Sequence, residues 1–445
     1  MSFFSVEFLI LIFIFFIVFN LLGKNKQNAL LLGFNILILY LFNPYCLLVV
    51  LVFSFFIHFF ALSVYVRNSK NIFYTAIFFI VLNLCIFKYY SSIKDSVDYV
   101  LSYFDIMIAD IIFPLGLSFY TFNAITYIVW VYKEKQEPVG YLTLFTYLSF
   151  FATFVSGPIF RYVDFIKQFN TLKRFKHKDL ILANLLFALV KVFLILPIVD
   201  KYFYAFLNDL NNLSFLGLLN CFYLYSIKLY LDFSAYINLV SAFALMIGFK
   251  LPKNFNNPFK ARNIQDFWKR WHISLSSFIR DYIYIPLGGN RVNRTSLNII
   301  IAFVISGIWH GNSYNFALWG LAHALGLIFI SLFSYRFNKF VASFITFTYI
   351  SIVWSFFYFV SFDEVREYFS FFLKFNFIDK REIYIFLVVF VLFIINFYSK
   401  NHLALVVNIL RHLNIFIKII VINLVLLIVF IYMPSGIPNF IYAGF

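Results

Sequence analysis

The chain has 445 residues, of which 63% are hydrophobic, 24% aromatic and 12% charged. Soluble proteins carry roughly 25% charged residues, so this chain cannot cover a water-facing surface, and its mean hydropathy of +0.90 agrees. Since one helical crossing of a bilayer takes about 20 residues, the composition predicts an all-α polytopic membrane protein surrounded by the lipid bilayer. Disordered, collagen-like and disulfide-scaffold classes are excluded.

The formal net charge of +16 comes mainly from two segments. Residues 161–178 hold six Lys and Arg against one acid, and residues 250–294 hold nine against two. Because basic loops of multi-pass proteins face the cytoplasm, we expect both segments there, and nucleic acid is not expected as a partner. Topology alone explains this charge, although a cationic face also suits an anionic soluble co-substrate, since Arg and Lys bind phosphates.

Apolar runs separated by short polar stretches predict the membrane helices in chain order. They lie at residues 3–22, 29–42, 46–66, 71–88, 111–131, 141–157, 180–200, 214–230, 234–249, 297–309, 315–334, 340–360, 383–398 and 415–432. The first run follows no basic segment and precedes no small-residue cleavage site, so we expect it to remain as a span. The runs at 29–42 and 297–309 are too short to cross alone and indicate re-entrant or broken helices.

Residues 264–283 have the pattern of one amphipathic helix, with Arg270 on its polar face. Its apolar stripe consists of Ile264, Phe267, Trp268, Trp271, Leu275, Phe278, Ile279 and Tyr282, which recur three or four residues apart. Such a helix lies along the membrane interface or lines a cavity that opens to water. His272 stands at the border of the stripe, where the simpler interpretation is an interfacial histidine with a wet edge.

A polar segment at residues 310–315 (HGNSYN) interrupts the apolar sequence where a span should lie at membrane depth. An ionisable side chain there is costly and by default marks a function. Gly307 and Gly311 flank Trp309–His310 and permit a kink or a close approach of two backbones. The alternative is that residues 297–309 form a complete short span and that His310 lies in an ordinary loop.

No metal, nucleotide or nucleophilic-serine motif can be read from the sequence. No two histidines have the spacing and the nearby carboxylate of a zinc site, and neither a phosphate-binding glycine loop nor a Gly-x-Ser-x-Gly motif occurs. His58 and His323 lie in apolar runs, which favours packed or hydrogen-bonded core residues. Three cysteines, each inside an apolar run, indicate neither a disulfide framework nor a metal cluster: Cys46, Cys85 and Cys221.

An imidazole at membrane depth can perform chemistry without a metal. It titrates near neutrality and can take a proton from a hydroxyl group, which could then attack a thioester. Such a base needs a route for each substrate and the exclusion of water. Asp232, four residues after Lys228, is a candidate orienting partner for this base, and a buried ion pair with Lys228 is the simpler alternative.

Six short motifs follow one another along the chain. They are FPLGLSFYTF at 113–122, FVSGPI at 154–159, DFSAY at 232–236, DFWKRWHISLS at 266–276, RDYIYIPLGG at 280–289 and GIWHG at 307–311. In this order they resemble the membrane-bound O-acyltransferase family, in the bacterial cell-envelope branch that contains alginate and peptidoglycan O-acetyltransferases and the related teichoic-acid D-alanyl transferase. The resemblance extends from the predicted fifth span to the eleventh, and the earlier spans match only in character.

The resemblance implies a ring of transmembrane and re-entrant helices around a central tunnel, which the acyl donor enters from the cytoplasm and the acceptor from outside. We expect N-terminal helices at 1–110, a catalytic core at 111–334 with a cytoplasmic amphipathic segment at 250–294, and C-terminal helices with an aromatic tail at 335–445. By the same resemblance, His310 is the catalytic residue and His272 the family's second histidine, which assists or positions the donor. The expected substrate-binding residues are Trp309, Gly311, Asp232, Trp268, Trp271 and Arg270.

The tail at 440–445 (FIYAGF) is similar to the Phe-x-Tyr-x-x-Phe terminus of the small partner in teichoic-acid D-alanylation, whose tyrosine accepts the acyl group. The hypothesis is that His310 deprotonates Tyr442, which then attacks the donor thioester. A phenol of pKa about 10 loses its proton far more readily than an alkyl hydroxyl. The alternative is an aromatic terminus that packs at the membrane interface, where Phe and Tyr are common.

The function implied is a multi-pass O-acyltransferase of the bacterial inner membrane, which moves an acetyl group toward a cell-envelope polysaccharide or peptidoglycan. Acetyl-CoA is expected as the donor substrate, no bound cofactor is expected, and an extracytoplasmic acetyltransferase or esterase-like partner would receive the acyl group. A D-alanyl transferase is the alternative within enzymes. A transporter or flippase is the alternative from another class, because intramembrane histidines also serve proton relays, and an envelope scaffold is a third possibility.

Overall fold

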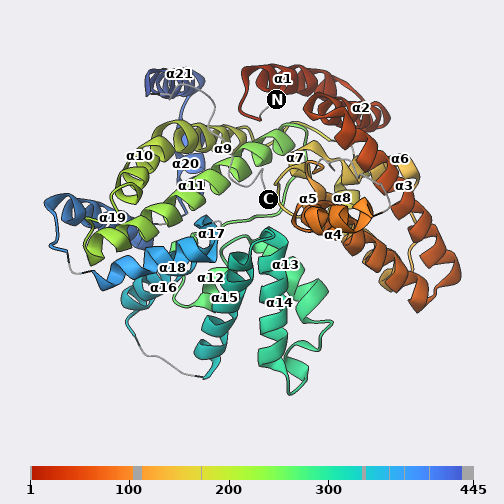
Figure 1. Cartoon of the computed structure of the whole chain (residues 1–445). Coiled ribbons are helices and arrows are strands. Elements are labelled where there is room, and N and C mark those ends of the chain that lie inside the picture. Colours follow the sequence, from red (N-terminus) through yellow and green to blue (C-terminus); the bar gives the residue numbers. More distant parts are fainter. Residues whose placement is uncertain are drawn as a thin grey trace. The chain divides into compact units, whose positions relative to one another are not determined.

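The structure, a computed structural model, describes residues 3–103, 113–171, 173–332, 337–359, 361–374, 376–399 and 401–432, without the side chains of residues 91–93 and 95. All regular elements in these ranges are helices (Figure 1). Eight helical segments of the described chain are long and apolar enough to cross a membrane: Pro44–Arg67, Lys70–Tyr90, Lys178–Leu207, Phe215–Met246, Tyr314–Leu332, Lys339–Tyr358, Lys380–Tyr398 and Ile415–Tyr432. The prediction of an all-α polytopic membrane protein is confirmed.

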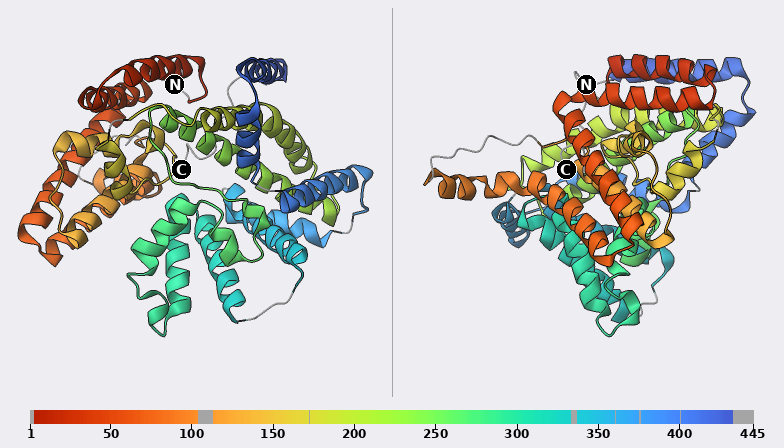
Figure 2. Two further views of the ribbon diagram at one scale, coloured as in Figure 1. Left: turned by 180° about the vertical axis from the view of Figure 1, so that it is seen from behind. Right: turned by 90° about the vertical axis from the view of Figure 1, so that its right-hand side faces the viewer.

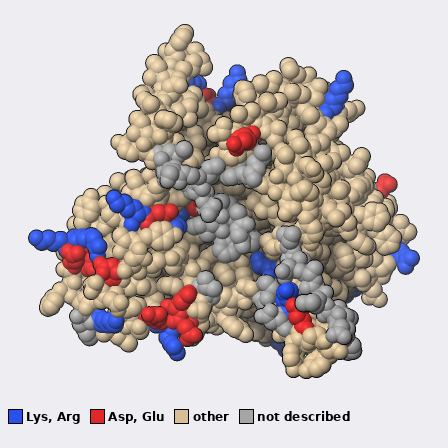
Figure 3. All heavy atoms as spheres, turned by 45° about the horizontal axis from the view of Figure 1, so that its top comes forward, with Lys and Arg blue, Asp and Glu red and all other residues tan. Residues whose placement is uncertain are grey.

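The surface agrees with a lipid environment. Figure 3 shows a face on which Lys, Arg, Asp and Glu are scattered over a surface of mostly uncharged residues. Large apolar side chains are exposed along most helices, and in the last span, α21 (Ile415–Tyr432), only 6% of residues are buried. Ile420 and Phe430, for example, are 56% and 78% exposed. In water such a surface would aggregate, whereas in hydrocarbon it costs nothing.

The chain divides into two compact units. The first contains the residues up to Ile181 together with Val240–Pro252. Its helices are α1 (Val6–Leu21), α2 (Lys24–Phe42), α3 (Pro44–Arg67), α4 (Lys70–Ser102), α5 (Leu117–Glu134), α6 (Tyr141–Leu148), α7 (Phe151–Phe154) and α8 (Tyr162–Phe169).

Two predicted runs of the first unit are shorter or broken in the structure. The run at 141–157 divides into α6 and α7, because the buried Asn35 side chain donates to the carbonyl of Thr146 (3.2 Å) and accepts from the backbone N–H of Phe151 (3.2 Å) at the break. In the described part of the run at 111–131, which begins at residue 113, the helix starts at Leu117, after Gly116 with a φ of 75°. The short run at 29–42 belongs to a longer helix, α2, which begins at Lys24.

The second unit contains Leu182–Leu239 and the residues from Lys253 onward. Before the site it contains α9 (Lys178–Val190) from Leu182 onward, the π-helix η1 (Lys191–Ile195), α10 (Leu196–Leu207), α11 (Phe215–Met246) as far as Leu239, and the 3₁₀ turn η2 (Pro258–Lys260). The site region contains α12 (Ile264–Trp268), α13 (Ile273–Ile279), η3 (Arg280–Tyr284), η4 (Gly289–Arg291), α14 (Thr295–His310) and α15 (Tyr314–Leu332). After it come α16 (Lys339–Val353), α17 (Ser355–Tyr358), α18 (Phe362–Ser370), η5 (Phe371–Leu373), α19 (Lys380–Tyr398), α20 (His402–His412) and α21.

The predicted spans at 214–230 and 234–249 are wrong as separate helices, because the structure has one helix, α11, over both. Its polar middle does not face water: Asp232 and Ser234 are each only 4% exposed. Ser234 accepts a hydrogen bond of 2.9 Å from Lys191. A polar residue with a partner inside the protein need not end a helix. The Lys191–Ser234 hydrogen bond therefore explains why the drop in hydropathy between residues 230 and 234 does not correspond to a loop.

Helices α14 and α15 lie side by side and antiparallel, as both views of the ribbon show (Figures 1 and 2). Their backbones approach closely at glycines. A Cβ atom at Gly307 would overlap the carbonyl oxygen of Phe316, and one at Gly320 would overlap that of Phe303. Small residues at such contacts are typical of helix pairs in membranes. The predicted close approach at Gly307 is therefore confirmed, and it brings the end of α14 against α15.

Candidate functional site

His310 is the last residue of α14 and is 4% exposed. The chain leaves the helix at Gly311, where a Cβ atom would overlap the ring of Phe316 on α15. His310 therefore does not lie in an ordinary loop, which was the alternative. It belongs to a helix of 16 residues, which is short for a membrane crossing.

Aromatic rings surround the His310 imidazole. Its ring centroid lies 4.5 Å from that of Trp309, 5.2 Å from that of Trp319 on α15 and 4.9 Å from that of Phe357 on α17. The Trp319 and Phe357 rings meet the imidazole nearly edge to face, at 81° and 74°. Such walls exclude water, and electrostatic interactions are strong in a site without water.

The ring of Trp319 contacts both His310 and a second histidine, His323. The His323 ring lies 4.7 Å from that of Trp319 and 5.0 Å from that of Trp268 on α12. Within the described chain, four buried polar atoms of this cluster have no hydrogen-bond partner: both His323 ring nitrogens and the indole nitrogens of Trp268 and Trp319. Buried polar groups are normally satisfied, so these atoms are the ones that a polar substrate group can engage.

The sequence predicts His323 to be a packed or hydrogen-bonded core histidine, and its full burial confirms this prediction. The sequence did not indicate that His323 lies beside the rings around His310. The missed signal was the spacing of Trp319 and His323, four residues apart on one face of α15, together with the Trp-rich motif at 266–276.

The single amphipathic helix predicted at 264–283 is wrong. The structure has α12 and α13 with a break between them, and His272 adopts the left-handed conformation with a φ of 42°. Asn254 competes for the backbone there, because its carbonyl accepts from Ile273 N–H (3.0 Å) and its side chain from Ser274 N–H (3.3 Å). Because of this break, Trp268 and Trp271, which belong to the same apolar stripe, pack against different residues, Trp319 and Trp354.

His272 lies in this break and is 2% exposed, so the interpretation as an interfacial histidine with a wet edge is wrong. Its ring packs 4.8 Å from that of Phe233 on α11. Burial lowers the pKa of His272 to about 3, which keeps the imidazole neutral at physiological pH. Neither of its ring nitrogens has a hydrogen-bond partner among the described residues. His272 can therefore hold a polar group, but it cannot supply a positive charge.

The remaining candidates lie near these two histidines. Trp271 is 3% exposed and packs 4.6 Å from Trp354, whereas Trp268 faces Trp319 at 5.7 Å. Arg270 forms an ion pair of 2.8 Å with Asp266, which already offsets its charge.

Asp232 is buried on α11, one residue before the Phe233 that contacts His272. The ion pair of Lys228 is formed with Asp200, at 2.8 Å, and Lys228 also donates to the hydroxyl of Tyr204 at 3.0 Å. Lys228 thus pairs with Asp200 and not with Asp232, the partner that the sequence suggested.

The structure brings the predicted residues into two neighbouring groups. His310 and Trp268 meet at Trp319, with Trp309 against His310, while His272 and Trp271 contact Phe233, which follows Asp232 on α11. Phe267 connects the two, since its ring lies 5.7 Å from Trp268 and 5.8 Å from Trp271. Tyr442 lies outside the described residues. Within the described ranges, no group of three or more His, Cys, Asp or Glu could hold a metal ion.

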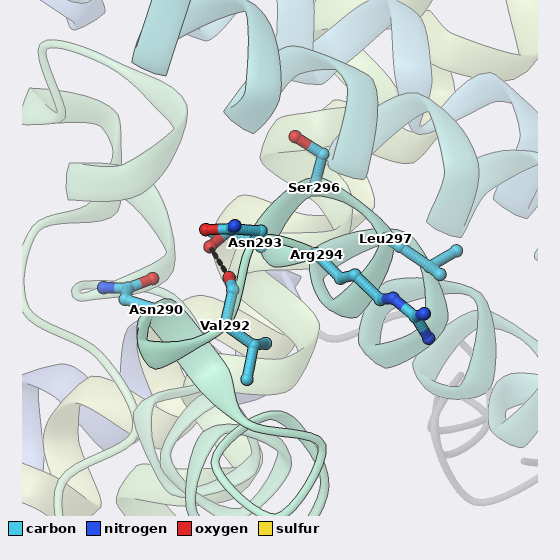
Figure 4. Close-up of a pocket in the computed structure, with 7 residues that line it drawn as sticks. Asn290, Val292, Asn293, Arg294, Ser296 and Leu297 are labelled. Carbon is cyan, nitrogen blue, oxygen red and sulfur yellow. Dashed lines mark hydrogen bonds between the residues drawn. The ribbon is translucent and has the colours of Figure 1, made fainter.

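A separate pocket of about 710 Å³ lies at the start of α14 (Figure 4). Its lining is polar and includes Asn290, Asn293 and Ser296, and the Thr295 hydroxyl donates to the carbonyl of Val292 at 3.2 Å. Arg294 and Leu297 point away from Asn290 in Figure 4. Because a helix of 16 residues is roughly 24 Å long, this pocket and His310 lie at opposite ends of α14.

Comparison with known proteins identifies relatives of this chain. A model of the membrane-bound O-acyltransferase family matches residues 119–371, which include every candidate except Tyr442. A peptidoglycan O-acetyltransferase of Helicobacter pylori is 34% identical over 286 residues, which cover 56% of this chain and 54% of that protein. A probable alginate O-acetylase of Azotobacter vinelandii is 35% identical over 265 residues, with 56% and 52% covered.

A teichoic acid D-alanyltransferase of Bacillus subtilis is 31% identical over 241 residues, which cover 51% of this chain and 60% of that protein. The chain thus spans about half the length of the curated relatives that it matches.

Proposed function

The chain belongs to the membrane-bound O-acyltransferase family, and on that premise we propose that it moves an acetyl group from a thioester donor, acetyl-CoA, across the bacterial inner membrane. The acetyl group is destined for O-acetylation of a cell-envelope polysaccharide or peptidoglycan. The observation that carries the proposal is the buried His310, held at the end of a short helix and walled by aromatic rings within the matched region.

In this proposal, His310 acts as the general base. Its neutral imidazole takes the proton of an attacking hydroxyl group, and the hydroxyl oxygen forms a bond to the thioester carbon. The carbon–sulfur bond then breaks, and the leaving thiolate of coenzyme A receives the proton. A base positioned in this way contributes roughly 10²–10⁴-fold to the rate. Helices around a central tunnel would bring donor and acceptor to His310 from opposite sides.

The neutral His272 positions the donor, because its unpartnered ring nitrogens can bind a polar group of the donor without adding charge. Trp268, Trp271, Trp309 and Gly311 shape the space around the acyl group. Asp232 supports His272 through the adjacent Phe233. Arg270 contributes less to binding of an anionic donor than its charge suggests, because its ion pair with Asp266 already neutralises that charge.

The attacking hydroxyl belongs to Tyr442 in the fuller form of this proposal. The phenolate oxygen forms an acyl ester, and an extracytoplasmic acetyltransferase or esterase-like partner then takes the acyl group to the polymer. The motif at 440–445 and the acidity of a phenol support this relay. Mass spectrometry of the C-terminal peptide after incubation with acetyl-CoA tests it. An acetyl adduct on Tyr442 is expected, and turnover without any adduct removes the relay.

A second candidate, D-alanyl transfer, is favoured by the 31% identity to the teichoic acid D-alanyltransferase. Purified protein in liposomes separates the candidates when it is supplied with acetyl-CoA or with a D-alanyl carrier protein. We expect ester formation and free coenzyme A from acetyl-CoA alone.

Replacing His310 with alanine separates the classes of function. An acyltransferase loses ester formation, a transporter loses flux of its cargo, and a scaffold is unaffected. Retention of acetyl transfer by the alanine variant contradicts the proposal.

A further inference from the structure

One side of the His310 site is formed by a very short helix, α17. This helix has four residues, and a single turn is not stable by its own hydrogen bonds. It nevertheless contains Phe357, whose ring lies 4.9 Å from the His310 imidazole and meets it nearly edge to face. Contacts from other segments must therefore hold α17 in place.

Asn315, in the first turn of α15, binds the end of this helix. Its side-chain nitrogen donates to the carbonyl of Phe359, the residue after α17, at 2.8 Å. Asn315 is fully buried, and its side-chain oxygen has no hydrogen-bond partner among the described residues. Because an amide buried among apolar groups is costly, packing alone does not favour asparagine at this position. The bond to Phe359 does.

The rings at the end of α17 point in two directions. Phe357 packs on α15, where its ring lies 5.0 Å from that of Phe316. The next residue, Tyr358, packs on α10 and α11, with its ring 5.2 Å from that of Phe203 and 5.2 Å from that of Tyr225. Apolar contacts have no fixed direction, so they permit α17 to shift toward α10 and α11. The hydrogen bond of Asn315 has a direction, and it holds the end of α17 toward α15.

We propose that Asn315 is a positioning residue for the His310 reaction. By binding the Phe359 carbonyl, it keeps the Phe357 ring over the imidazole and keeps water out of the site. It acts through Phe357 and not by contact with a substrate. This inference rests on the proposed function, in which a thioester beside a general base must be protected from hydrolysis.

Water that enters the site has a defined reaction. His310 takes a proton from the water molecule, whose oxygen forms a bond to the thioester carbon. The carbon–sulfur bond then breaks, and the leaving thiolate of coenzyme A receives the proton. The products are acetate and free coenzyme A, and no ester is formed. The ratio of coenzyme A released to ester formed therefore reports whether the site is closed.

Asn315→Leu keeps the approximate size of the side chain and removes the donor. For the full-length protein in liposomes, we expect the ratio of coenzyme A released to ester formed to rise roughly tenfold or more. The kcat for acetyl transfer should fall by a similar factor, with little change in the KM for acetyl-CoA. Asn315→Ala removes the same donor with a smaller side chain, and it replaces the leucine variant in the test if that variant does not fold.

Asn423→Leu is the matched control for this substitution. Asn423 on α21 is exposed, and its side-chain nitrogen also donates to a backbone carbonyl, that of Ile419, at 2.9 Å. The control should behave as the wild type. A ratio and a kcat for Asn315→Leu equal to those of the control would overturn the proposal.

A double-mutant cycle with Phe357→Ala separates positioning from a general loosening of the protein. Phe357→Ala should by itself raise the ratio of coenzyme A to ester. If Asn315 acts through the Phe357 ring, Asn315→Leu should change the ratio little further in the Phe357→Ala background, because residues that act through one contact are not additive. Effects of the two substitutions that multiply would contradict the proposal.

Hydrogen exchange of the detergent-solubilised protein tests the contact without turnover. The backbone N–H groups of Phe357 and Phe359 donate to carbonyls within the same segment. They should exchange roughly tenfold faster or more in Asn315→Leu, and at the wild-type rate in the control. Faster exchange in a protein that transfers no acetyl group supports the contact and removes the proposed function. Unchanged exchange, or faster exchange in an active protein with an unchanged ratio, overturns the positioning role.

Discussion

His272 shows how the setting of a single residue sets its chemistry. Burial lowers the pKa of this side chain to about 3, whereas an unfolded chain binds a proton there below about pH 6.5. The folded and unfolded states therefore bind equal numbers of protons above about pH 6.5. Below that pH only the unfolded state gains a proton, so stability falls with decreasing pH until the folded pKa is reached, by about 1.4 kcal/mol per pH unit.

We expect His272→Gln to reduce this loss of stability. The measurement is the thermal midpoint of the detergent-solubilised protein between pH 7 and pH 5, for the wild type and the variant. The wild-type midpoint should fall more steeply than that of the variant. Equal slopes would show that His272 is protonated in the folded state and would remove its role as a neutral positioning group.

The ring of Trp319 contacts both histidines of the α14–α15 pair, and its buried indole nitrogen has no hydrogen-bond partner among the described residues. Trp319→Phe keeps the ring that packs on His310 and His323 and removes the one N–H group. If this donor binds the acyl group as its charge develops, kcat should fall roughly 10²-fold with little change in KM. Trp130→Phe, in the first unit, is the control. An unchanged kcat for Trp319→Phe would show that the indole serves packing alone.

At the scale of elements, the α14–α15 contact holds the site together. Gly320→Ala places a methyl group against the carbonyl of Phe303, and the two backbones must separate. Overpacking of this kind costs roughly 1–3 kcal/mol, and it also moves Trp319 away from His310. We expect a lower thermal midpoint and a loss of acyl transfer. Gly33→Ala, whose Cβ meets nothing within 4 Å, should leave both unchanged or raise the midpoint slightly. A Gly320→Ala variant with wild-type behaviour would contradict the close contact.

The elements that sequence reasoning predicted well are those whose pattern is local. The hydropathy run at 415–432 coincides with α21, and the runs at 315–334 and 383–398 agree with α15 and α19 to within three residues at either end. The errors came from partners distant in the sequence. Asn254 breaks the helix predicted at 264–283, and Lys191 satisfies Ser234 in the middle of α11. No periodicity in a single segment contains this information.

At the scale of the whole molecule, composition alone predicted the class, because a chain with 12% charged residues needs lipid around it. The ordered motifs predicted the family, and the match over residues 119–371 confirms it. His310 was predicted because a polar segment interrupts an apolar run, and His272 because it lies at the border of an amphipathic stripe and matches the family's second histidine. His323 was predicted only as a packed core residue, and within its own run only the four-residue spacing from Trp319 pointed to the cluster. The tunnel and the acylated tail stay predictions.

The most direct measurement is the rate of acetyl transfer from acetyl-CoA by the full-length protein in liposomes, compared between wild type, His310→Gln and His412→Gln. His412 is exposed at the end of α20 and serves as the matched control. With His310 as the base, His310→Gln should lower kcat roughly 10²-fold or more, while the protein stays folded and His412→Gln behaves as the wild type. Transfer at the wild-type rate by a folded His310→Gln protein would contradict the account.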